Sequence, residues 1–267
     1  MNFDQVFKQI FSNEAHSPLL PSGMRSLDNL IGGGFTNEVT VIAGRPNHGK
    51  TLFLFNLMLN LSYYQEHKGM VVMPMNQLSS FTRQVCSIIQ DQKEYTDDWA
   101  DDLILDSLSD VKSLIRHRVK VDFRIPTLEE VFTTALAWKA TYLILDDFFL
   151  SIEHPKDFQS SLKKLYLFSK EHQIPVFLSL ITQSRVEKRG GDRRPEIGDL
   201  YRSEIVCQYV HKIFQTYSPF VYGIVEDEYG NMTKGTMEIC LQKNNLGRTG
   251  TLTVKLKDSG KIEADWG

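Results

Sequence analysis

The chain is predicted to adopt an α/β fold built on a mostly parallel sheet. Over the first two thirds, short β-rich runs alternate with longer helical stretches, the pattern that right-handed crossovers between parallel strands require. After residue 201, β-rich runs are separated by turns rich in Gly and Asn, which indicates antiparallel strands that extend the sheet, or hairpins. Parallel strands are expected at residues 38–43, 70–74, 119–124, 142–146 and 176–182, and antiparallel strands at 210–216, 236–242 and 251–257.

Composition narrows the class of protein. The 267 residues, 42% of them hydrophobic and 24% charged, suit a folded chain of one large domain or two small ones and argue against disordered, collagen-like and coiled-coil proteins. The net charge of −3 excludes a global field that attracts nucleic acid, so any such contact must come from a local basic patch.

The cysteines and the apolar stretches of the sequence indicate the cellular compartment. The three cysteines, Cys86, Cys207 and Cys240, are far apart and odd in number, which argues against a disulfide framework or a zinc site and favours a reducing cytoplasm. The start of the chain lacks a signal-peptide pattern. The most apolar stretch, residues 51–61, is too short for a membrane span, which needs about 20 apolar residues. We therefore expect a cytoplasmic protein with no membrane partner.

Residues 1–21 are predicted to form an N-terminal arm that precedes a single domain over residues 22–267. Apolar side chains recur in the arm at helical spacing, and a proline-containing link follows. The helix either packs on its own domain or docks on a neighbouring subunit. The apolar positions are Phe3, Val6, Phe7, Ile10 and Phe11.

The strongest motif is a phosphate-binding loop (P-loop) between a β-rich run and an apolar helix. It has Gly, four residues, then Gly-Lys-Thr, so that backbone N–H groups and a helix N-terminus can surround phosphate oxygens. Lys50 is expected to reach the β- and γ-phosphates of ATP, and the Thr51 hydroxyl to bind Mg²⁺. His48 either contacts a phosphate or occupies a variable position. The predicted cofactor-binding residues are Gly44, Arg45, Pro46, Asn47, His48, Gly49, Lys50 and Thr51.

A second motif supports the first. The apolar run at residues 142–145 ends in Asp146, the Walker B form in which the carboxylate holds Mg²⁺ through water. The next residue, Asp147, is either a base that activates water or a solvated turn residue.

Residues 22–267 resemble the C-terminal ATPase domain of DnaB-type replicative helicases, which has a RecA-like fold. The resemblance rests on landmarks that occur in order along nearly the whole chain. They are the segments 22–28, 38–51, 194–203 and 243–250.

The resemblance implies a homo-oligomeric ring, usually of six subunits, with ATP between neighbours and single-stranded DNA in the centre. Replication proteins or helicase loaders are implied as further partners. The basic run at residues 185–194, expected to be exposed and mobile, is our candidate for a salt-dependent grip on DNA phosphates, with a solvated charged loop as the alternative. The candidate DNA-binding residues are Arg185, Lys188, Arg189, Arg193 and Arg194.

The chain departs from the family at two catalytic positions. Asn76 stands where the family has its catalytic Glu, and an amide can orient water but cannot accept its proton. Asn245 stands at the arginine-finger position, two residues after Lys243, so Arg248 or Arg185 is a candidate replacement. Gln183 is the candidate sensor of the γ-phosphate. The predicted catalytic residues are Lys50, Asp146, Asp147, Gln183, Lys243 and Arg248.

Three functions remain open from the sequence. The first is a helicase domain that couples ATP hydrolysis to DNA translocation, with relocated catalytic parts. The second is a catalytically weakened relative that acts as a nucleotide-gated ring or a regulator of a helicase. The third is a binding protein that ATP assembles into a ring on DNA.

Overall fold

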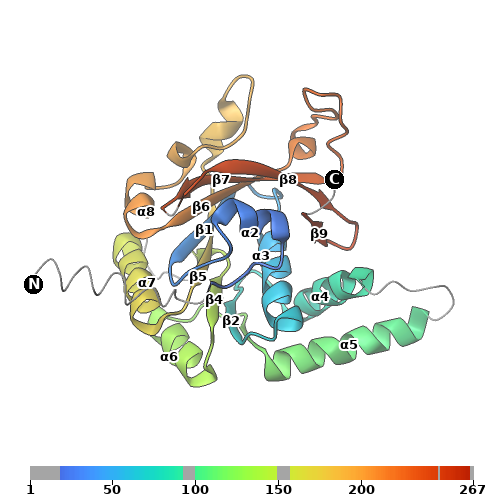
Figure 1. The fold of residues 1–267 in the computed structure, drawn as a ribbon, viewed down its shortest axis with the longest axis vertical. Coiled ribbons are helices and arrows are strands. Elements are labelled where there is room, and N and C mark those ends of the chain that lie inside the picture. The colour runs from blue at the N-terminus through green and yellow to red at the C-terminus, as the bar shows by residue number, and fades with distance from the viewer. Residues whose placement is uncertain (1–18, 93–99, 149–156, 246, 265–267) are drawn as a thin grey trace, which may run out of the picture.

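A computed structural model describes residues 19–92, 100–148, 157–245 and 247–264 of the chain. In these residues nine strands form one sheet, in the spatial order β3-β2-β4-β5-β1-β6-β7-β8-β9 (Figure 1). The strands are β1 (Val39–Gly44), β2 (Gly69–Val72), β3 (Val119–Asp122), β4 (Tyr142–Leu145), β5 (Val176–Ile181), β6 (Lys212–Tyr217), β7 (Thr236–Asn244), β8 (Gly250–Leu256) and β9 (Ile262–Glu263).

The predicted α/β class is confirmed. Strands β1 to β6 run parallel to one another, and the pairings β6–β7, β7–β8 and β8–β9 are antiparallel. The 210–216 run, expected as an antiparallel strand or part of a hairpin, is antiparallel to β7 on one side and parallel to β1 on the other. The short helix α8 (Ser203–Tyr209) precedes β6 and supplies the crossover that a parallel strand needs. The short β9 was not predicted.

Helices cover both faces of the sheet. The core on one face is formed with α2, α3, the π-helix η1, α4 and α5, and the core on the other with α6, α7 and α8 (Figure 1). These elements are α2 (Arg25–Ile31), α3 (Lys50–Leu59), η1 (Asn60–Tyr64), α4 (Leu78–Gln92), α5 (Ala100–His117), α6 (Leu128–Trp138) and α7 (Phe158–His172). The predicted arm helix lies outside the described residues.

The central strand β1 is buried along its whole length, as a parallel strand covered on both faces requires. Its side chains alternate between the two cores, with Val41 on the α6–α8 side and Ile42 on the α3 side. Because β1 is flanked by β5 and β6, the loop that follows it lies in the middle of the sheet edge.

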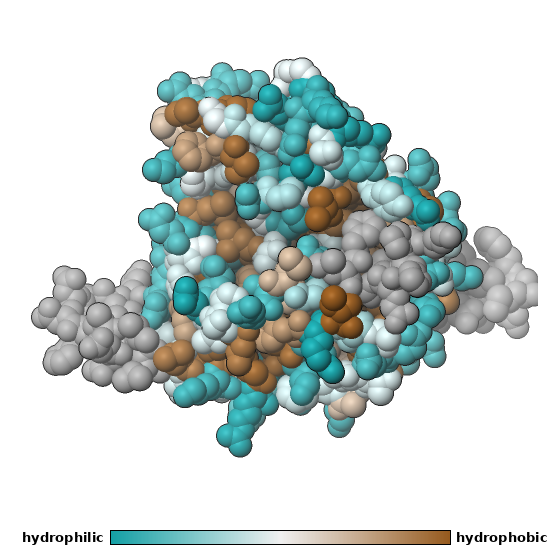
Figure 2. Space-filling view, turned by 180° about the vertical axis from the view of Figure 1, so that it is seen from behind, coloured by the Kyte–Doolittle hydropathy of each residue, from teal (hydrophilic) through white to brown (hydrophobic). Residues whose placement is uncertain are grey.

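Two segments extend from this carboxyl edge of the sheet. One, residues 184–199, contains the 3₁₀ turns η4 (Ser184–Lys188) and η5 (Ile197–Asp199), and the other, residues 218–235, begins with η6 (Pro219–Tyr222) (Figure 1). The second segment carries an apolar patch, visible at the upper left of Figure 2. Its exposed members include Phe220, Val221, Ile224, Val225 and Met232. No helix within the described residues is long and apolar enough to cross a membrane.

Candidate functional site

The P-loop turns between the end of β1 and the start of α3, as predicted. Gly49 has a φ of 87°, a left-handed conformation that favours glycine, and it caps the N-terminus of α3. A Cβ atom at Gly49 would lie 2.3 Å from the Met237 sulfur, and one at Gly44 would lie 2.5 Å from the Thr216 hydroxyl. Both glycines are therefore required by close packing against β6 and β7 as well as by the turn.

The motif lysine and threonine meet the Walker B aspartate. Thr51 Oγ1 donates a hydrogen bond to Asp146 Oδ2 at 2.8 Å, and Ser179 Oγ donates one to Asp146 Oδ1 at 2.5 Å. The Lys50 ammonium lies 3.1 Å from the carbonyl oxygen of Arg45, and burial lowers the pKa of Lys50 while Asp147 and Asp146 oppose that shift. Hydroxyl and carboxylate oxygens are the ligands that Mg²⁺ prefers, so these residues fit a Mg²⁺–nucleotide complex.

Asp147 is held beside this cluster in an unusual backbone conformation. Its φ is 51°, and its backbone N–H donates to Ser179 Oγ at 2.7 Å. Burial and the neighbouring charge of Asp146 raise the pKa of Asp147, and Lys50 acts in the opposite direction. A half-buried carboxylate with a raised pKa is a better proton acceptor than an exposed one.

Other predicted residues follow the neighbouring strands. Asn76 comes four residues after β2, the strand that pairs with β4, and is half-buried. Gln183 follows β5, and its side-chain amide donates to the carbonyl of Leu200 at 3.4 Å. Asn76, Asp146 and Gln183 thus share the carboxyl edge of the sheet with the P-loop, where α/β proteins bind their ligands.

His48 is an anchor of the P-loop. Its side chain is buried, Nδ1 accepts a hydrogen bond from the Ser218 backbone N–H at 2.9 Å, and its ring stacks on Tyr217. Burial, with the charges of Lys50 and Arg45 nearby, lowers the pKa of His48 to about 4. The imidazole is therefore neutral at pH 7 and ties the loop to the end of β6.

Arg45 also reaches out of the P-loop. Its Nε lies 2.8 Å from Glu187 Oε1, and its Nη1 donates to the carbonyl of Thr182 at 2.9 Å. Pro46 and Asn47 are exposed at the tip, where Asn47 has a φ of 65°.

The basic run at residues 185–194 is exposed in part, but its contacts do not match a mobile loop. Arg189 makes a bidentate pair with the buried Asp199, at 2.8 and 3.0 Å. Arg194 donates to Glu238 of β7 from two nitrogens, Nε and Nη2, at 2.7 and 2.8 Å. Arg185 lies 3.4 Å from Asp199, and Lys188 has no carboxylate partner in the described part of the chain.

Sequence reasoning missed an aromatic group beside the P-loop. The Tyr222 ring lies 4.9 Å from the His48 ring, and the Arg193 guanidinium lies over Tyr222 at 5.2 Å. Aromatic and guanidinium planes are surfaces on which a nucleobase can stack. Because Tyr222 contacts His48 of the P-loop and Arg193 lies over Tyr222, Arg193 also lies beside the P-loop. No motif marks Tyr222, because its neighbours in space come from three separate segments.

Lys243 and Arg248 lie at the other edge of the sheet. β7 runs antiparallel to β6, so Asn244 pairs with Lys212 near the start of β1, and the Asn244 side chain donates to the carbonyl of Arg248 at this amino end of the parallel strands. The Lys243 ammonium donates to the carbonyls of Cys207 and Val210, and Arg248 is exposed. Neither residue joins the P-loop of its own chain.

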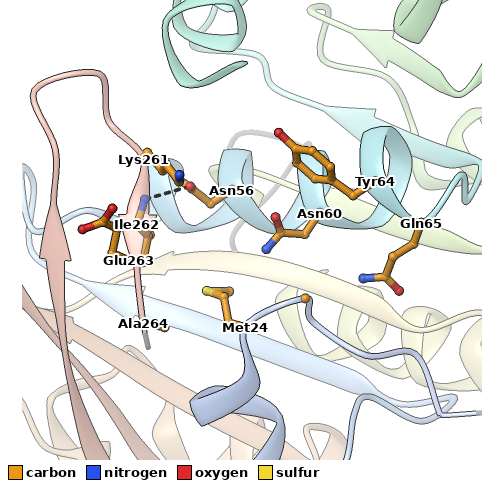
Figure 3. Close-up of a pocket in the computed structure, with 10 residues that line it drawn as sticks. Met24, Asn56, Asn60, Tyr64, Gln65, Lys261, Ile262, Glu263 and Ala264 are labelled. Atoms are coloured by element: carbon orange, nitrogen blue, oxygen red, sulfur yellow. Dashed lines mark hydrogen bonds between the residues drawn. The ribbon is translucent and has the colours of Figure 1, made fainter. Parts of the chain in front are cut away.

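A separate pocket of about 530 Å³ lies between η1, the 22–24 turn and β9 (Figure 3). Asn56 accepts a hydrogen bond from the Ile262 N–H, and Asn60 donates one to the carbonyl of Ser22. These two asparagines therefore tie the C-terminal strand and the start of the domain to the apolar helix. The pocket shares no residue with the predicted site.

Comparison with known proteins finds relatives by sequence and by structure. The replicative DNA helicase DnaB of Mycoplasma genitalium is 23% identical over 276 residues, which cover 95% of this chain and 58% of that protein. A DnaB-like replicative helicase, solved in work on its interactions with primase, has a TM-score of 0.75 at 18% identity and covers 97% of this chain and 65% of its own. A KaiC-like protein from Pyrococcus horikoshii has a TM-score of 0.63 at 15% identity over 92% of this chain and 97% of its own.

The two structural matches show the fold alone. The chain spans little more than half the length of the curated relatives that it matches. The family of the DnaB-like helicase C terminal domain matches residues 20–264, nearly the whole chain. The P-loop, the Walker B strand and the RecA-like sheet are thus explained together, and the chain belongs to the DnaB-like helicase C-terminal domain family.

Proposed function

We propose that this chain is the ATPase domain of a replicative DNA helicase, which couples ATP hydrolysis to the binding and translocation of single-stranded DNA. The observation that carries the proposal is the cluster of Lys50, Thr51 and Asp146 at the carboxyl edge of the sheet. Two hydroxyls orient the Asp146 carboxylate, as a Mg²⁺ site needs.

In this proposal Thr51 and Asp146 hold Mg²⁺, and Lys50 and the P-loop backbone hold the phosphates. Bound Mg²⁺ supplies charge neutralisation at the phosphate oxygens. Asp147 takes the proton of the attacking water in place of the family's Glu, because Asn76 cannot accept a proton. Gln183, between the P-loop and Asp146 on the sheet edge, is the proposed sensor of the γ-phosphate.

The opposite placement of the P-loop and Arg248 supports a ring. A subunit whose P-loop is on one sheet edge and whose exposed arginine is on the other can complete the site of a neighbour in a head-to-tail ring. Arg248 and Lys243 are proposed to act in this way across the interface. Lys243 would first have to leave the two carbonyls that it now contacts.

The second candidate is a ring that binds nucleotide and DNA but hydrolyses ATP slowly. Two substitutions favour it: Asn76 stands where the family has a catalytic Glu, and Asn245 stands where it has an arginine finger. An arginine finger is worth about 10³- to 10⁵-fold in rate, so its loss without replacement would leave little turnover.

Steady-state ATP hydrolysis with and without single-stranded DNA separates the two. DNA-stimulated turnover of about 1 per second or more, lost in Lys50→Ala, supports the helicase domain. Tight binding of ATP with turnover no higher than in Lys50→Ala supports the nucleotide-gated ring. Absence of nucleotide binding contradicts both.

A further inference from the structure

One ion pair joins the P-loop to the basic segment. The Arg45 side chain is largely buried, and it contacts Glu187 of η4 at 2.8 Å and the carbonyl of Thr182 at 2.9 Å. The hydrogen bond from Arg45 holds the pKa of Glu187 below its usual range, so both partners are charged at pH 7. The positive charge of Arg193 also lowers the pKa of this carboxylate.

The turn η4 presents different side chains in different directions. Val186 is fully buried and anchors the turn to the domain. In a 3₁₀ helix, side chains three residues apart eclipse each other, so Arg185 and Lys188 share one exposed face. Glu187 lies beside that face and points to Arg45. The position of η4 about Val186 therefore sets where the cationic face of Arg185 and Lys188 is presented.

The Arg45–Glu187 ion pair is also connected to Lys50, which is predicted to bind the phosphates. The Lys50 ammonium is 3.1 Å from the carbonyl oxygen of Arg45. A phosphate that draws Lys50 toward itself competes with this hydrogen bond and so acts on the backbone of Arg45, whose side chain holds Glu187.

We propose that the Arg45–Glu187 ion pair is a positioning element that makes the DNA affinity of the Arg185–Lys188 face depend on the nucleotide in the P-loop. This inference rests on the proposed function, because it needs a chain that binds both ATP and single-stranded DNA. It assigns Glu187 no contact with ATP or DNA.

The test measures the affinity for a labelled oligo-dT by fluorescence anisotropy, once with a non-hydrolysable ATP analogue and once with ADP. The readout is the ratio of the two dissociation constants. Removal of a carboxylate near DNA strengthens binding in both states, so a purely electrostatic effect leaves the ratio unchanged. The variant is Glu187→Gln. The matched control is Glu196→Gln, which removes the same charge from the same segment at a residue 3.4 Å from Arg189 and away from Arg45.

In the wild type we expect a ratio of about tenfold or more, an ordinary coupling between two sites. Glu187→Gln should reduce the ratio to about one, with the affinity for the ATP analogue itself unchanged, whereas Glu196→Gln should keep the wild-type ratio. A wild-type ratio in Glu187→Gln, or equal loss in both variants, overturns the inference and leaves the proposed function intact. The inference is also overturned if the wild type binds DNA with the same affinity in the presence of the ATP analogue and of ADP. Absence of DNA binding in every state overturns the proposed function as well.

Discussion

Individual side chains in the P-loop make structural contacts that its consensus pattern does not specify. His48 occupies a position that the pattern leaves open, yet its buried imidazole accepts a hydrogen bond from Ser218 and stacks on Tyr217. Such an acceptor must stay neutral, so protonation of His48 and the native P-loop contacts exclude each other.

The pKa of His48 predicts how the stability of the protein depends on pH. The folded-state pKa of about 4 lies below the ordinary 6.5, so protons bind the unfolded chain more tightly between these values. Stability from this group is present above pH 6.5 and is lost as pH falls toward 4. Between pH 7 and pH 5 we expect a loss of about 2 kcal/mol in the free energy of unfolding.

Urea unfolding of the wild type and of His48→Asn at the two pH values checks this. Asparagine offers an oxygen acceptor to Ser218 and does not titrate. The variant should lose about 2 kcal/mol less than the wild type over the same interval. Equal losses in the two proteins would show that His48 titrates normally in the folded state.

Asp147 is the second residue with a testable role. Asp147→Asn keeps the size of the side chain and tolerates a positive φ, so folding should survive. If Asp147 is the base, ATP turnover should fall by about 10²-fold or more while nucleotide binding persists. Because the base must be deprotonated, wild-type turnover should also decline as pH falls through the raised pKa of Asp147.

Asn76→Ala is the comparison for Asp147→Asn. An amide that only orients water should cost less than a lost base, so Asn76→Ala should retain a larger share of the turnover. The opposite order, with full turnover in Asp147→Asn and none in Asn76→Ala, would assign the central role to Asn76.

At the level of elements, the 184–199 segment is ordered by buried carboxylates. Asp199 is 3% exposed and receives Arg189 through two hydrogen bonds as well as the backbone N–H of Glu196. Glu238 of β7 receives Arg194. The arginines that were predicted to bind DNA thus partly hold the segment itself through these ion pairs.

Asp199→Asn should loosen this segment. A hydrogen bond to a charged group contributes about 1.5–3 kcal/mol, so its loss should raise the open fraction roughly tenfold or more. Trypsin cleavage after the arginines of the 185–194 run, followed by mass spectrometry, tracks that fraction. Asp192→Asn is the control, because Asp192 is exposed and lies 3.4 Å from Arg194. Equal cleavage rates in the two variants would mean that Asp199 does not hold the segment.

For the whole molecule, the two edges of the sheet carry complementary halves of the proposed ATPase site. The P-loop and Asp146 lie at the carboxyl edge, and Arg248 lies by the turn at the amino edge. Since one chain cannot bring both edges together, the proposed site predicts that turnover requires an interface between subunits.

Mixing two inactive variants tests this arrangement. Lys50→Ala removes the P-loop lysine and Arg248→Ala removes the proposed finger, so each should be inactive alone. In a co-assembled equal mixture, about a quarter of the interfaces combine an intact P-loop with an intact Arg248, and activity should reappear. ATP turnover of the mixture is the measurement. No recovery, in a mixture shown to co-assemble, would exclude a role for Arg248 across the interface.

Local pattern was sufficient for much of this molecule. Each of the eight predicted strands is found with its bounds within two residues, because short apolar runs bounded by turn residues suit buried strands. The parallel pairing of β6 with β1 was not predicted, because the short α8 that precedes β6 is too brief to stand out as a crossover helix. The P-loop and Asp146 could be proposed from the sequence because the residues of each motif are contiguous in the chain.

The sequence by itself determined the α/β class, the family and the nucleotide motif, since these depend on periodicity and on residues close together in the chain. The tertiary structure alone decided the partners of each charge. Arg45 meets Glu187 across 142 positions, and Tyr222 meets His48 and Arg193 from other segments. Such contacts depend on where strands β1, β5 and β6 end relative to one another, and strand order and register are set by packing of the whole sheet rather than by any local sequence.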